Sequence, residues 1–561
     1  MVQEVLVFIS TIIGLAAILT IIAKAIKQPP IIAYLISGVL VGPLFFGFIG
    51  PGTASSELVQ VFAHIGVALL LFIVGLSLDL RVLKEVGAVS AIAGFGGILL
   101  TAGIGFLISI GIGFNNLTAL YLALAIAFSS TVVVVKILSD KKEIDTLHGR
   151  IALGILIIQD FVAALALMIF PLINGGSLNS ILIQVGKIIA LITVVFLIST
   201  FVLKWFLHYL ARSQEVLFLS GIAWALVIAT LFNQFGLSLE IGALIAGMSL
   251  ASSKYTLELG GKIKPLRDFF IILFFIFFGS QLATSFSPAL ICAAIILSIF
   301  VIFGKPLILM ILIRFFGYKK RTNFLTSSSL AQISEFSLIL ILLGFNLGHL
   351  SQEIMSLSVV IALVTIAIST YTTHHASKIF DSISGALNLF EGRETAVETR
   401  PRKTYEVVLF GYNRTGYSLL KTLKDMDIEF IVVDYNPRVI MNLSKKKINC
   451  VYGDASDKEF IDDLGLDKAK LVISTIPELD SNLIIKKRLN NVKSKAIFIA
   501  TSDQIDDSLR LYKEGVDFVI TPHILGGEFA SALIKKNKIN RWRYKKISKK
   551  HIKELKKRNN H

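Results

Sequence analysis

Three ionisable side chains lie inside long apolar stretches of the chain, where charge is costly. Asp160 and Glu335 are about twelve and about ten residues into such stretches, and Lys305 is inside another. A charge at bilayer depth costs at least about 2.5–3.5 kcal/mol, so each of these residues predicts a function. A buried carboxylate that binds either one proton or one cation, but not both, couples the movement of the two by competition. Asp160 is the strongest candidate, because it lies roughly 18 Å deep, near the midplane.

The same residues have a plainer structural interpretation. Lys305 and one of the acids would form a buried ion pair, or Glu335 would lie at the cytoplasmic face if its span is displaced along the chain. Neither interpretation requires transport.

Two short polar clusters at similar depth predict interrupted helices. The first consists of Ser129, Ser130 and Thr131, and the second of Gln332, Ser334 and Glu335. An interrupted helix exposes backbone carbonyls and amides, and hydroxyl or amide side chains can replace the hydration shell of a small cation. The alternative is that the hydroxyls bond back to their own helices.

The stretches that position these residues are long enough to cross a bilayer, which takes roughly 20 apolar residues. Thirteen such spans precede residue 380, with approximate extents 5–26, 31–48, 57–78, 87–113, 117–138, 148–174, 180–208, 215–235, 238–253, 265–284, 288–315, 325–347 and 352–377. The whole chain is 54% hydrophobic and 17% charged, whereas soluble proteins carry about 25% charged residues. A multi-pass α-helical membrane protein is therefore predicted, and a single water-soluble domain is excluded.

Basic residues gather at the ends of odd-numbered spans and in the loops after them, as at Lys24, Arg81 and Lys141. Loops after even-numbered spans carry almost none, and Lys187 is the exception. Basic loops stay on the cytoplasmic side. We therefore expect a plasma-membrane protein with its N-terminus outside and everything after residue 380 in the cytoplasm.

Spans that are seven apart in order resemble each other. Residues 35–43 of span 2 match 240–248 of span 9, and 71–78 of span 3 match 275–282 of span 10. The two predicted interruptions, in spans 5 and 12, are also seven apart. An offset of seven reverses direction, so the pattern predicts the inverted repeats of secondary transporters. Glycines that merely pack helices are the alternative.

Residues 1–383 resemble a known family, the monovalent cation:proton antiporter-2 family, which includes the Kef-type potassium efflux systems. The resemblance depends on Gly38–Pro43, Ser129–Thr131, Gln159–Asp160, Gly242–Gly247, Lys305–Pro306 and Leu330–Phe336. It implies that Asp160 takes up either a cation or a proton, that Ser129–Thr131 and Gln332–Glu335 form crossed broken helices, and that Lys305 sits beside the site. It also implies alternating access, in which a core domain moves against a dimerisation domain of a homodimer.

The resemblance also bears on stoichiometry and substrate. Some relatives have an acid where this chain has Gln159, so we expect one proton per cation and no net charge moved, unless Lys305 releases a proton of its own. The cation is K⁺ or Na⁺. A ligand-gated potassium channel is one alternative, although the sequence lacks a TVGYG-like filter, and a glutathione-gated efflux system is another.

After a polar linker at 384–404, the hydrophobic pattern changes to that of short buried strands. A strand at 405–410, a turn, a helix and a strand at 429–434 form a βαβ unit whose nucleotide-binding candidates are Gly411, Asn413, Arg414, Gly416 and Asp434. Such a unit holds phosphate at the helix N-terminus and ribose hydroxyls at the acid. Asn413 replaces the middle glycine of the fingerprint, which disfavours a full dinucleotide and leaves a mononucleotide.

Residues 405–522 as a whole resemble the RCK N-terminal (TrkA-N) domain. Besides the fingerprint, the resemblance depends on Gly453–Ser456, which contains Asp454, and on Ser474–Pro477. It implies a Rossmann-like α/β domain that dimerises, binds a regulatory nucleotide such as NAD(H) or AMP, and controls the membrane part. No catalytic constellation indicates a dehydrogenase, so an enzyme is not expected. A nucleotide-free dimerisation domain is the alternative.

Positive charge is concentrated at the C-terminus. The formal net charge is +17, to which residues 1–383 contribute +6, 384–534 contribute −1 and 535–561 contribute +12. We expect the basic tail, 523–561, to contact anionic lipid rather than nucleic acid, with a solvated, unstructured tail as the alternative. Cys292 and Cys450 form no metal-ligand or disulfide pattern, so no metal is expected beyond the transported cation.

Overall fold

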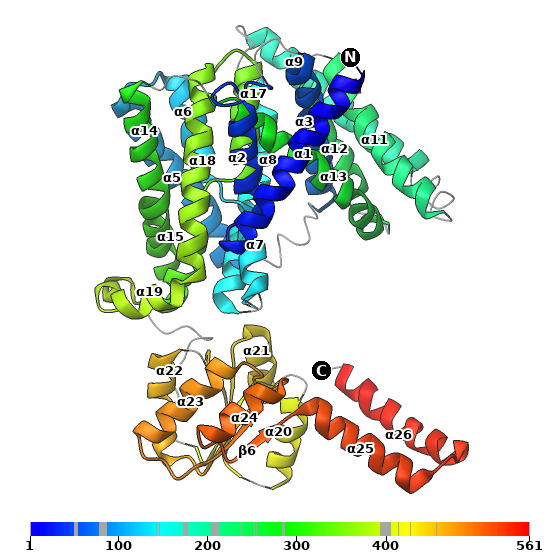
Figure 1. The fold of residues 1–561 in the computed structure, drawn as a ribbon, viewed down its shortest axis with the longest axis vertical. Helices are drawn as coiled ribbons and strands as arrows, with labels where there is room; N and C mark the ends of the chain where they lie inside the picture. The colour runs from blue at the N-terminus through cyan, green and yellow to red at the C-terminus, as the bar shows by residue number, and fades with distance from the viewer. Residues whose placement is uncertain are drawn as a thin grey trace. The chain divides into compact units, whose positions relative to one another are not determined.

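The computed structural model of the chain describes residues 2–49, 54–77, 87–141, 143–144, 146–171, 178–203, 213–235, 237–251, 253, 255–282, 287–392, 405–412, 415–426, 428–455 and 457–559. The chain forms two compact units, residues 1–393 and 394–561. The first is made of helices and the second contains a parallel sheet (Figure 1).

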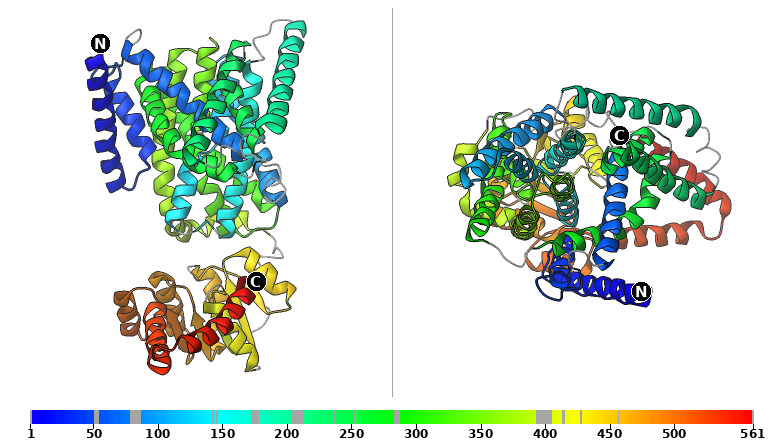
Figure 2. Two further views of the ribbon diagram at one scale, coloured as in Figure 1. Left: turned by 90° about the vertical axis from the view of Figure 1, so that its right-hand side faces the viewer. Right: turned by 90° about the horizontal axis from the view of Figure 1, so that it is seen from above.

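The first unit is a bundle of apolar helices that follow the predicted spans. They are α1 (Val2–Ala25), α2 (Pro30–Val41), α3 (Ala54–Ser77), α5 (Gly87–Ile112), α6 (Asn116–Ala127), α7 (Thr131–Asp140), α8 (Leu147–Ile169), α9 (Leu178–Leu197) with η2 (Ile198–Leu203), α11 (Gln214–Gln234), α12 (Leu239–Leu250), α13 (Thr256–Ser280), α14 (Pro288–Ile299), η3 (Phe300–Gly304), α15 (Lys305–Arg314), α16 (Lys320–Ser329), α17 (Glu335–Asn346) and α18 (Gln352–His374). In the described part, seven helical stretches are long and apolar enough to cross a membrane. α1 lies at the edge of the bundle in both views of Figure 2. The prediction of a multi-pass membrane protein is confirmed.

Two spans are interrupted where the sequence predicted it. The first break, residues 128–130, separates α6 from α7, and the second break, residues 330–334, separates α16 from α17. Ser130 and Ser334 cap the second halves, because their hydroxyl oxygens accept hydrogen bonds from Val133 N and Phe336 N. Such a cap satisfies an amide that has no partner within the helix.

Close contacts at glycines join the helices that were predicted to be repeats. A Cβ atom added at Gly38 of α2 would lie 2.1 Å from Ile276 O of α13, and one added at Gly247 of α12 would lie 2.1 Å from Phe72 O of α3. Helix α2 (span 2) therefore packs on α13 (span 10), and α12 (span 9) packs on α3 (span 3). Spans 2 and 9 are one repeat pair and spans 3 and 10 are the other, so each contact joins a member of one pair to a member of the other. This exchange of partners is what an inverted repeat requires.

Residues 376–392 fold against one end of the bundle, which we call the linker end. α19 (Ala376–Ile383) and the 3-10 turn η4 (Ala386–Phe390) pack on α15 and α16 through Met310, Phe380 and Leu387, and α19 lies at the foot of α15 in Figure 1. Gly392 N donates to Tyr318 O at 3.1 Å. The segment 384–392, which was predicted to begin the linker, thus continues the membrane unit.

The second unit contains a six-stranded parallel sheet in the order β3-β2-β1-β4-β5-β6. The strands are β1 (Val407–Phe410), β2 (Phe430–Asp434), β3 (Cys450–Tyr452), β4 (Leu471–Ser474), β5 (Ile497–Thr501) and β6 (Phe518–Ile520). Both faces of the sheet are buried: Val408 and Phe410 belong to one apolar cluster, and Val407 and Leu409 to another. Helices α20 (Thr415–Asp425), α21 (Pro437–Lys445), α22 (Lys458–Asp463), α23 (Leu479–Asn491) and α24 (Ile505–Lys513) connect the strands. The order is that of doubly wound nucleotide-binding folds, so the Rossmann-like prediction is confirmed.

Two helices follow the sheet, α25 (Pro522–Asn537) and α26 (Arg541–Asn559). The basic tail is therefore helical in its described part, and the unstructured alternative is wrong there. Apolar side chains of this hairpin are exposed, among them Phe529, Ile534 and Trp542.

Candidate functional site

Asp160 lies on α8, beside the first break. Its Oδ2 accepts a hydrogen bond from Thr131 Oγ1 at 2.9 Å. Thr131 is the first residue of α7, so the positive end of that helix dipole is near the carboxylate. Asp160 and Thr131 are partly exposed, whereas the neighbouring Ser129 and Ser130 are buried.

Gln159 holds the first break in position. Its Oε1 accepts from Ser129 N at 3.1 Å, and its Nε2 donates to Ala127 O at 3.5 Å. Ser129 Oγ in turn donates to Leu330 O at 3.0 Å, which joins the first break to the second. An amide can accept and donate in this way, whereas a carboxylate can only accept. The neutral amide of Gln159 thus stabilises the first break.

Lys305 begins α15 directly after the π-helical turn η3. Its backbone N–H donates to Phe300 O, five residues back, and Pro306 has no N–H with which to continue a regular ladder. Such π-turns redirect the side chain that follows them. Here Lys305 is directed into the bundle, where it is only 1% exposed.

The ammonium group of Lys305 bridges the two breaks through backbone carbonyls. Its Nζ donates to Ile126 O at 3.2 Å, Phe128 O at 2.8 Å and Gln332 O at 2.9 Å. These three bonds use all three donors of the ammonium. The alternative of an ion pair between Lys305 and a buried acid is therefore wrong: the ammonium charge is balanced by carbonyl dipoles, including those at the negative end of α6.

Glu335 is the first residue of α17 and is 7% exposed. The alternative that it lies at a surface is therefore wrong. Ser334 Oγ lies 3.4 Å from Glu335 Oε2, and the side chain of Ser130 is near enough to interact with Glu335. The charge of Glu335 is close enough to interact with that of Asp160. We call the region where the two breaks and these two acids meet the crossing.

Two hydroxyls that sequence reasoning missed hold the second break. Ser337 Oγ accepts from Ser334 N at 3.1 Å and donates to Ala125 O, and Thr365 Oγ1 accepts from Ile333 N at 3.4 Å. Ser337 follows the N-cap residue Ser334 by three positions, which is the spacing of a capping box. This spacing could have identified Ser337 from the sequence. Gln332, in contrast, has both side-chain amide atoms buried without a partner among the described residues.

The arrangement at the crossing offers ligands for a monovalent cation and a site for a proton. In the described residues, His, Cys, Asp and Glu form no group of three that could hold a metal ion. A partly exposed carboxylate beside a hydroxyl instead offers oxygen ligands for one small cation, or a site for one proton. The crossing can therefore support competition between the two.

The second unit contains the predicted nucleotide turn. Gly411 has φ +84°, which only glycine adopts without strain, and a Cβ at Gly416 would lie 2.1 Å from Gly411 O. The close approach of helix α20 to the turn therefore requires glycine at both positions. Asn413 and Arg414 lie outside the described residues. Asp454 follows β3, at the same edge of the sheet as Asp434.

Asp434 is bonded to the turn itself. Its Oδ2 accepts from Tyr412 N and its Oδ1 from Asn436 N, both at 2.8 Å. Burial raises the pKa of this carboxyl above its ordinary value of 3.8, although the two hydrogen bonds act in the opposite direction. Sequence reasoning assigned Asp434 to ribose hydroxyls, whereas in this structure it also fixes the glycine turn.

Comparison with known proteins agrees with this architecture. Residues 12–378 match the family described as sodium/hydrogen exchanger, transmembrane, and residues 407–522 match the TrkA-N domain. YbaL of Escherichia coli (strain K12) is 31% identical over 492 residues, which are 84% of this chain and 87% of that protein. The glutathione-regulated potassium-efflux system protein KefC of Escherichia coli O45:K1 (strain S88 / ExPEC) is 26% identical over 519 residues, 90% of this chain and 81% of that one. The sodium proton antiporter MjNhaP1 from Methanocaldococcus jannaschii covers 69% of this chain and 98% of its own, with 16% identity and a TM-score of 0.49.

Proposed function

Because the chain belongs to the transmembrane sodium/hydrogen exchanger family and carries a TrkA-N domain, we propose that it exchanges a monovalent cation for protons at Asp160. The chain is a multi-pass membrane antiporter of the Kef type. The observation that carries the assignment of the site is the position of Asp160: it is partly exposed, bonded to Thr131 at 2.9 Å, and close to the crossing. A ligand-gated channel is not favoured by the family match.

Replacement of Asp160 tests this assignment. Asp160→Asn in reconstituted vesicles is expected to reduce cation-dependent proton movement to background, because an amide cannot alternate between a bound proton and a bound cation. Asp140→Asn is the control, since Asp140 is exposed and pairs with Lys136 on the surface of its own helix. Retained exchange by a folded Asp160→Asn protein would refute the assignment.

We propose that one proton is exchanged for each cation. Gln159 is neutral and is bonded into the first break, and Lys305 has its three donors on carbonyls. Among the described acids of the crossing, Asp160 is then the partly exposed one, whereas Glu335 is buried. Exchange whose rate changes steeply with an imposed membrane potential would contradict this stoichiometry.

The cation is proposed to be K⁺ or Na⁺. The name of KefC refers to potassium and that of the matched family to sodium, and a site of one carboxylate and one hydroxyl accommodates either. Proton flux in vesicles under opposed KCl and NaCl gradients separates the two. Glutathione added to the same vesicles tests whether it regulates this chain as the name of KefC indicates for that protein.

We propose that the second unit regulates transport by binding a nucleotide such as NAD(H) or AMP. The support is the doubly wound sheet, the turn at Gly411 and the acids Asp434 and Asp454 at one edge. Calorimetric titration of the full-length protein with adenine nucleotides tests this. No heat with any of them would favour a nucleotide-free dimerisation domain.

The topology and assembly are also proposals. From the loop charges, the linker end faces the cytoplasm and the N-terminus lies outside. A cysteine introduced at exposed position 391 should then react only with reagents added from the cytoplasmic side.

A homodimer is proposed, to be checked by cross-linking in membranes. The basic hairpin α25–α26 is proposed to contact anionic lipid, because it joins a charge of +12 in 535–561 to exposed apolar side chains.

A further inference from the structure

Buried hydroxyls follow one face of α18. Thr365, Ser369 and Thr373 are spaced by four, so their side chains lie one above another. Thr365 Oγ1 accepts from Ile333 N at 3.4 Å, and Thr373 Oγ1 donates to Ser328 O at 3.5 Å. These contacts turn the face toward α16 and the second break, with Ser369 between them. None of the three hydroxyl residues is more than 3% exposed. We call this region the α16–α18 seam.

Several buried polar atoms at the second break and on helices α16 and α18 lack protein partners among the described residues. Ser369 Oγ and both side-chain amide atoms of Gln332 are buried without a hydrogen bond among the described residues, and so are Ser327 Oγ and Asn323 Oδ1 of α16. Buried polar groups in proteins are almost always bonded, and ordered water supplies the bond where no protein group does. The unpaired atoms at the second break and on α16 and α18 are therefore groups that ordered water would satisfy.

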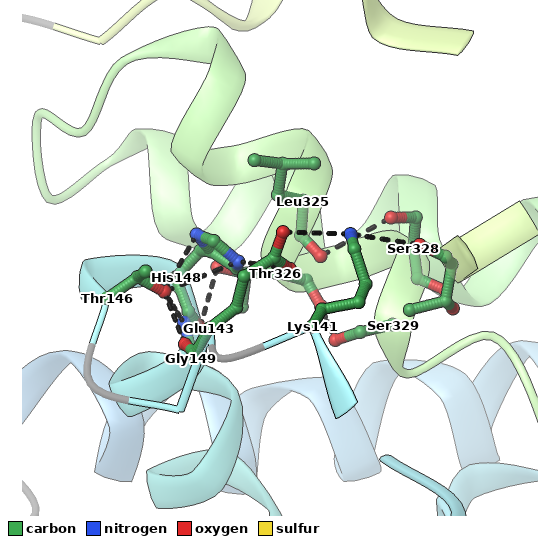
Figure 3. A network of polar contacts seen from close by, with 10 residues as sticks. Lys141, Glu143, Thr146, His148, Gly149, Leu325, Thr326, Ser328 and Ser329 are labelled. Atoms are coloured by element: carbon green, nitrogen blue, oxygen red, sulfur yellow. Dashed lines mark hydrogen bonds and ion pairs between the residues drawn. The ribbon is translucent and has the colours of Figure 1, made fainter. Parts of the chain in front are cut away.

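The seam ends at a charged group at the linker end. Lys141 Nζ donates to Thr373 O at 3.4 Å and lies 2.9 Å from Glu143 Oε1, while Glu143 Oε2 lies 3.3 Å from His148 Nε2. Figure 3 shows this group beside Thr326 and Ser328 of α16. The side chains of Lys141 and Glu143 are 18% and 23% exposed. One end of the seam therefore reaches solvent.

The other end of the seam reaches the crossing. The backbone carbonyl of Gln332 accepts a hydrogen bond from Lys305 Nζ, and its side-chain amide has no partner among the described residues. Gln332 precedes Glu335 by three residues. Glu335 interacts with Asp160. Buried polar groups thus occur at intervals between solvent at the linker end and the carboxylates of the crossing.

We propose that the α16–α18 seam holds a file of ordered water that carries protons between solvent at the linker end and the crossing. The inference rests on the proposed exchange at Asp160. Each water accepts one proton as it releases another, so every O–H bond formed is matched by one broken. At the crossing the proton joins or leaves the carboxylate of Glu335 or Asp160, and at the other end it joins or leaves bulk water. Cations reach Asp160 from its exposed side, so the two substrates use different routes.

A valine at position 369 tests the route, because it removes the hydroxyl and fills the space of a water. Ser369→Val is expected to lower the maximal exchange rate about tenfold, the size expected for loss of one hydrogen bond, with the KM for the cation unchanged. Ser369→Thr, which keeps the hydroxyl, should restore the rate. Ser358→Val is the matched control: Ser358 is equally buried on the same helix, but its Oγ donates to Ile354 O at 2.8 Å and lies beyond the second break. Equal effects of the two valine variants, or a changed KM in Ser369→Val, would overturn the proposal.

A second measurement does not depend on transport. A cryo-EM map of the wild-type protein that resolves internal water should show density within hydrogen-bonding distance of Ser369 Oγ and of the Gln332 amide. Absence of water there, in a map that shows it elsewhere in the protein, would overturn the proposal even if exchange at Asp160 is confirmed. Conversely, water in the seam of a protein that fails to exchange cations would refute only the function of Asp160.

Discussion

Thr131 Oγ1 donates to Asp160 Oδ2 at 2.9 Å, so the residue that begins α7 is bonded directly to the carboxylate at the crossing. The bond stabilises the ionised form of the acid, which is the form that binds a cation. It also ties the position of the carboxylate to the first break, so movement of the break changes the ligands available to the ion.

Thr131→Val should weaken cation binding without abolishing exchange. Removal of a hydrogen bond to a charged group costs roughly 1.5–3 kcal/mol, and so the KM for the cation should rise by about tenfold or more. Transport at varied cation concentration measures this. Thr230→Val is a suitable control, because Thr230 is exposed and its hydroxyl donates to its own helix at Leu226 O. An unchanged KM in Thr131→Val would show that the bond has no part in binding.

Lys305→Met should destabilise the membrane unit. The substitution leaves Ile126 O, Phe128 O and Gln332 O buried without the ammonium donor, and an unsatisfied buried acceptor costs about 1–3 kcal/mol. The thermal unfolding midpoint in detergent, followed by tryptophan fluorescence, measures the loss. Lys262→Met, at an exposed lysine that bonds Gln214, should leave the midpoint nearly unchanged. A Lys305→Met protein as stable as wild type would contradict this account of the ammonium.

Gly38→Ala should disrupt the packing of α2 on α13. The added methyl group would lie 2.1 Å from Ile276 O, which is backbone and cannot move alone, and overpacking of this kind costs about 1–3 kcal/mol or more. Gly103→Ala is the control, since a Cβ there has no atom within 4 Å. Unfolding midpoints of the two variants should differ clearly, and equal midpoints would argue against the close helix contact.

Asp434 should make the second unit less stable as the pH rises. Its folded-state pKa is raised above 3.8 by burial, so the folded state holds the proton more tightly than the unfolded state does. Stability is then greatest below about 3.8, falls as the pH rises through the raised folded-state pKa, and is constant above it. Hydrogen exchange of β1 and β2 in the full chain, compared with Asp434→Asn at each pH, measures the effect. A wild-type protein that gains stability over Asp434→Asn as the pH rises would show that the hydrogen bonds from Tyr412 and Asn436 outweigh burial.

Truncation after Ile534 should remove any dependence of regulation on anionic lipid. Each basic residue near an anionic surface contributes about 1 kcal/mol, and the deleted segment carries a charge of +12. Exchange in vesicles with and without anionic lipid, for full-length and truncated protein, is the measurement. If the two proteins respond identically to lipid, α26 does not act at the membrane surface.

Much of this architecture could be predicted from apolar periodicity and composition. The apolar helices of the first unit, both breaks and the parallel sheet follow from patterns that reflect burial directly. The partner of Lys305 could not be predicted in the same way. Its charge implied a partner, but every residue has a carbonyl, so nothing in the sequence distinguishes Ile126, Phe128 and Gln332 as acceptors.

The local sequence pattern also predicts the structure poorly where tertiary contacts determine it. Residues 384–392 are polar enough to predict a linker, yet Asn323 Nδ2 donates to Phe390 O and holds them on α16. The tail is charged enough to predict disorder, yet α26 forms a helix from Arg541. Asp434 matched a ribose-binding position, while its bond to Tyr412 N depends on the three-dimensional approach of the turn.

The attachment of residues 390–392 has a mechanical consequence. Phe390, Glu391 and Gly392 are bonded to the beginning of α16 and the turn before it, through Asn323 Nδ2, Lys320 N and Tyr318 O. α16 is a rod about 15 Å long, with the second break at its far end. A force transmitted along the chain to Gly392 would therefore act on one half of a broken helix. We expect that such a force changes the geometry of the crossing without any contact with the ion site.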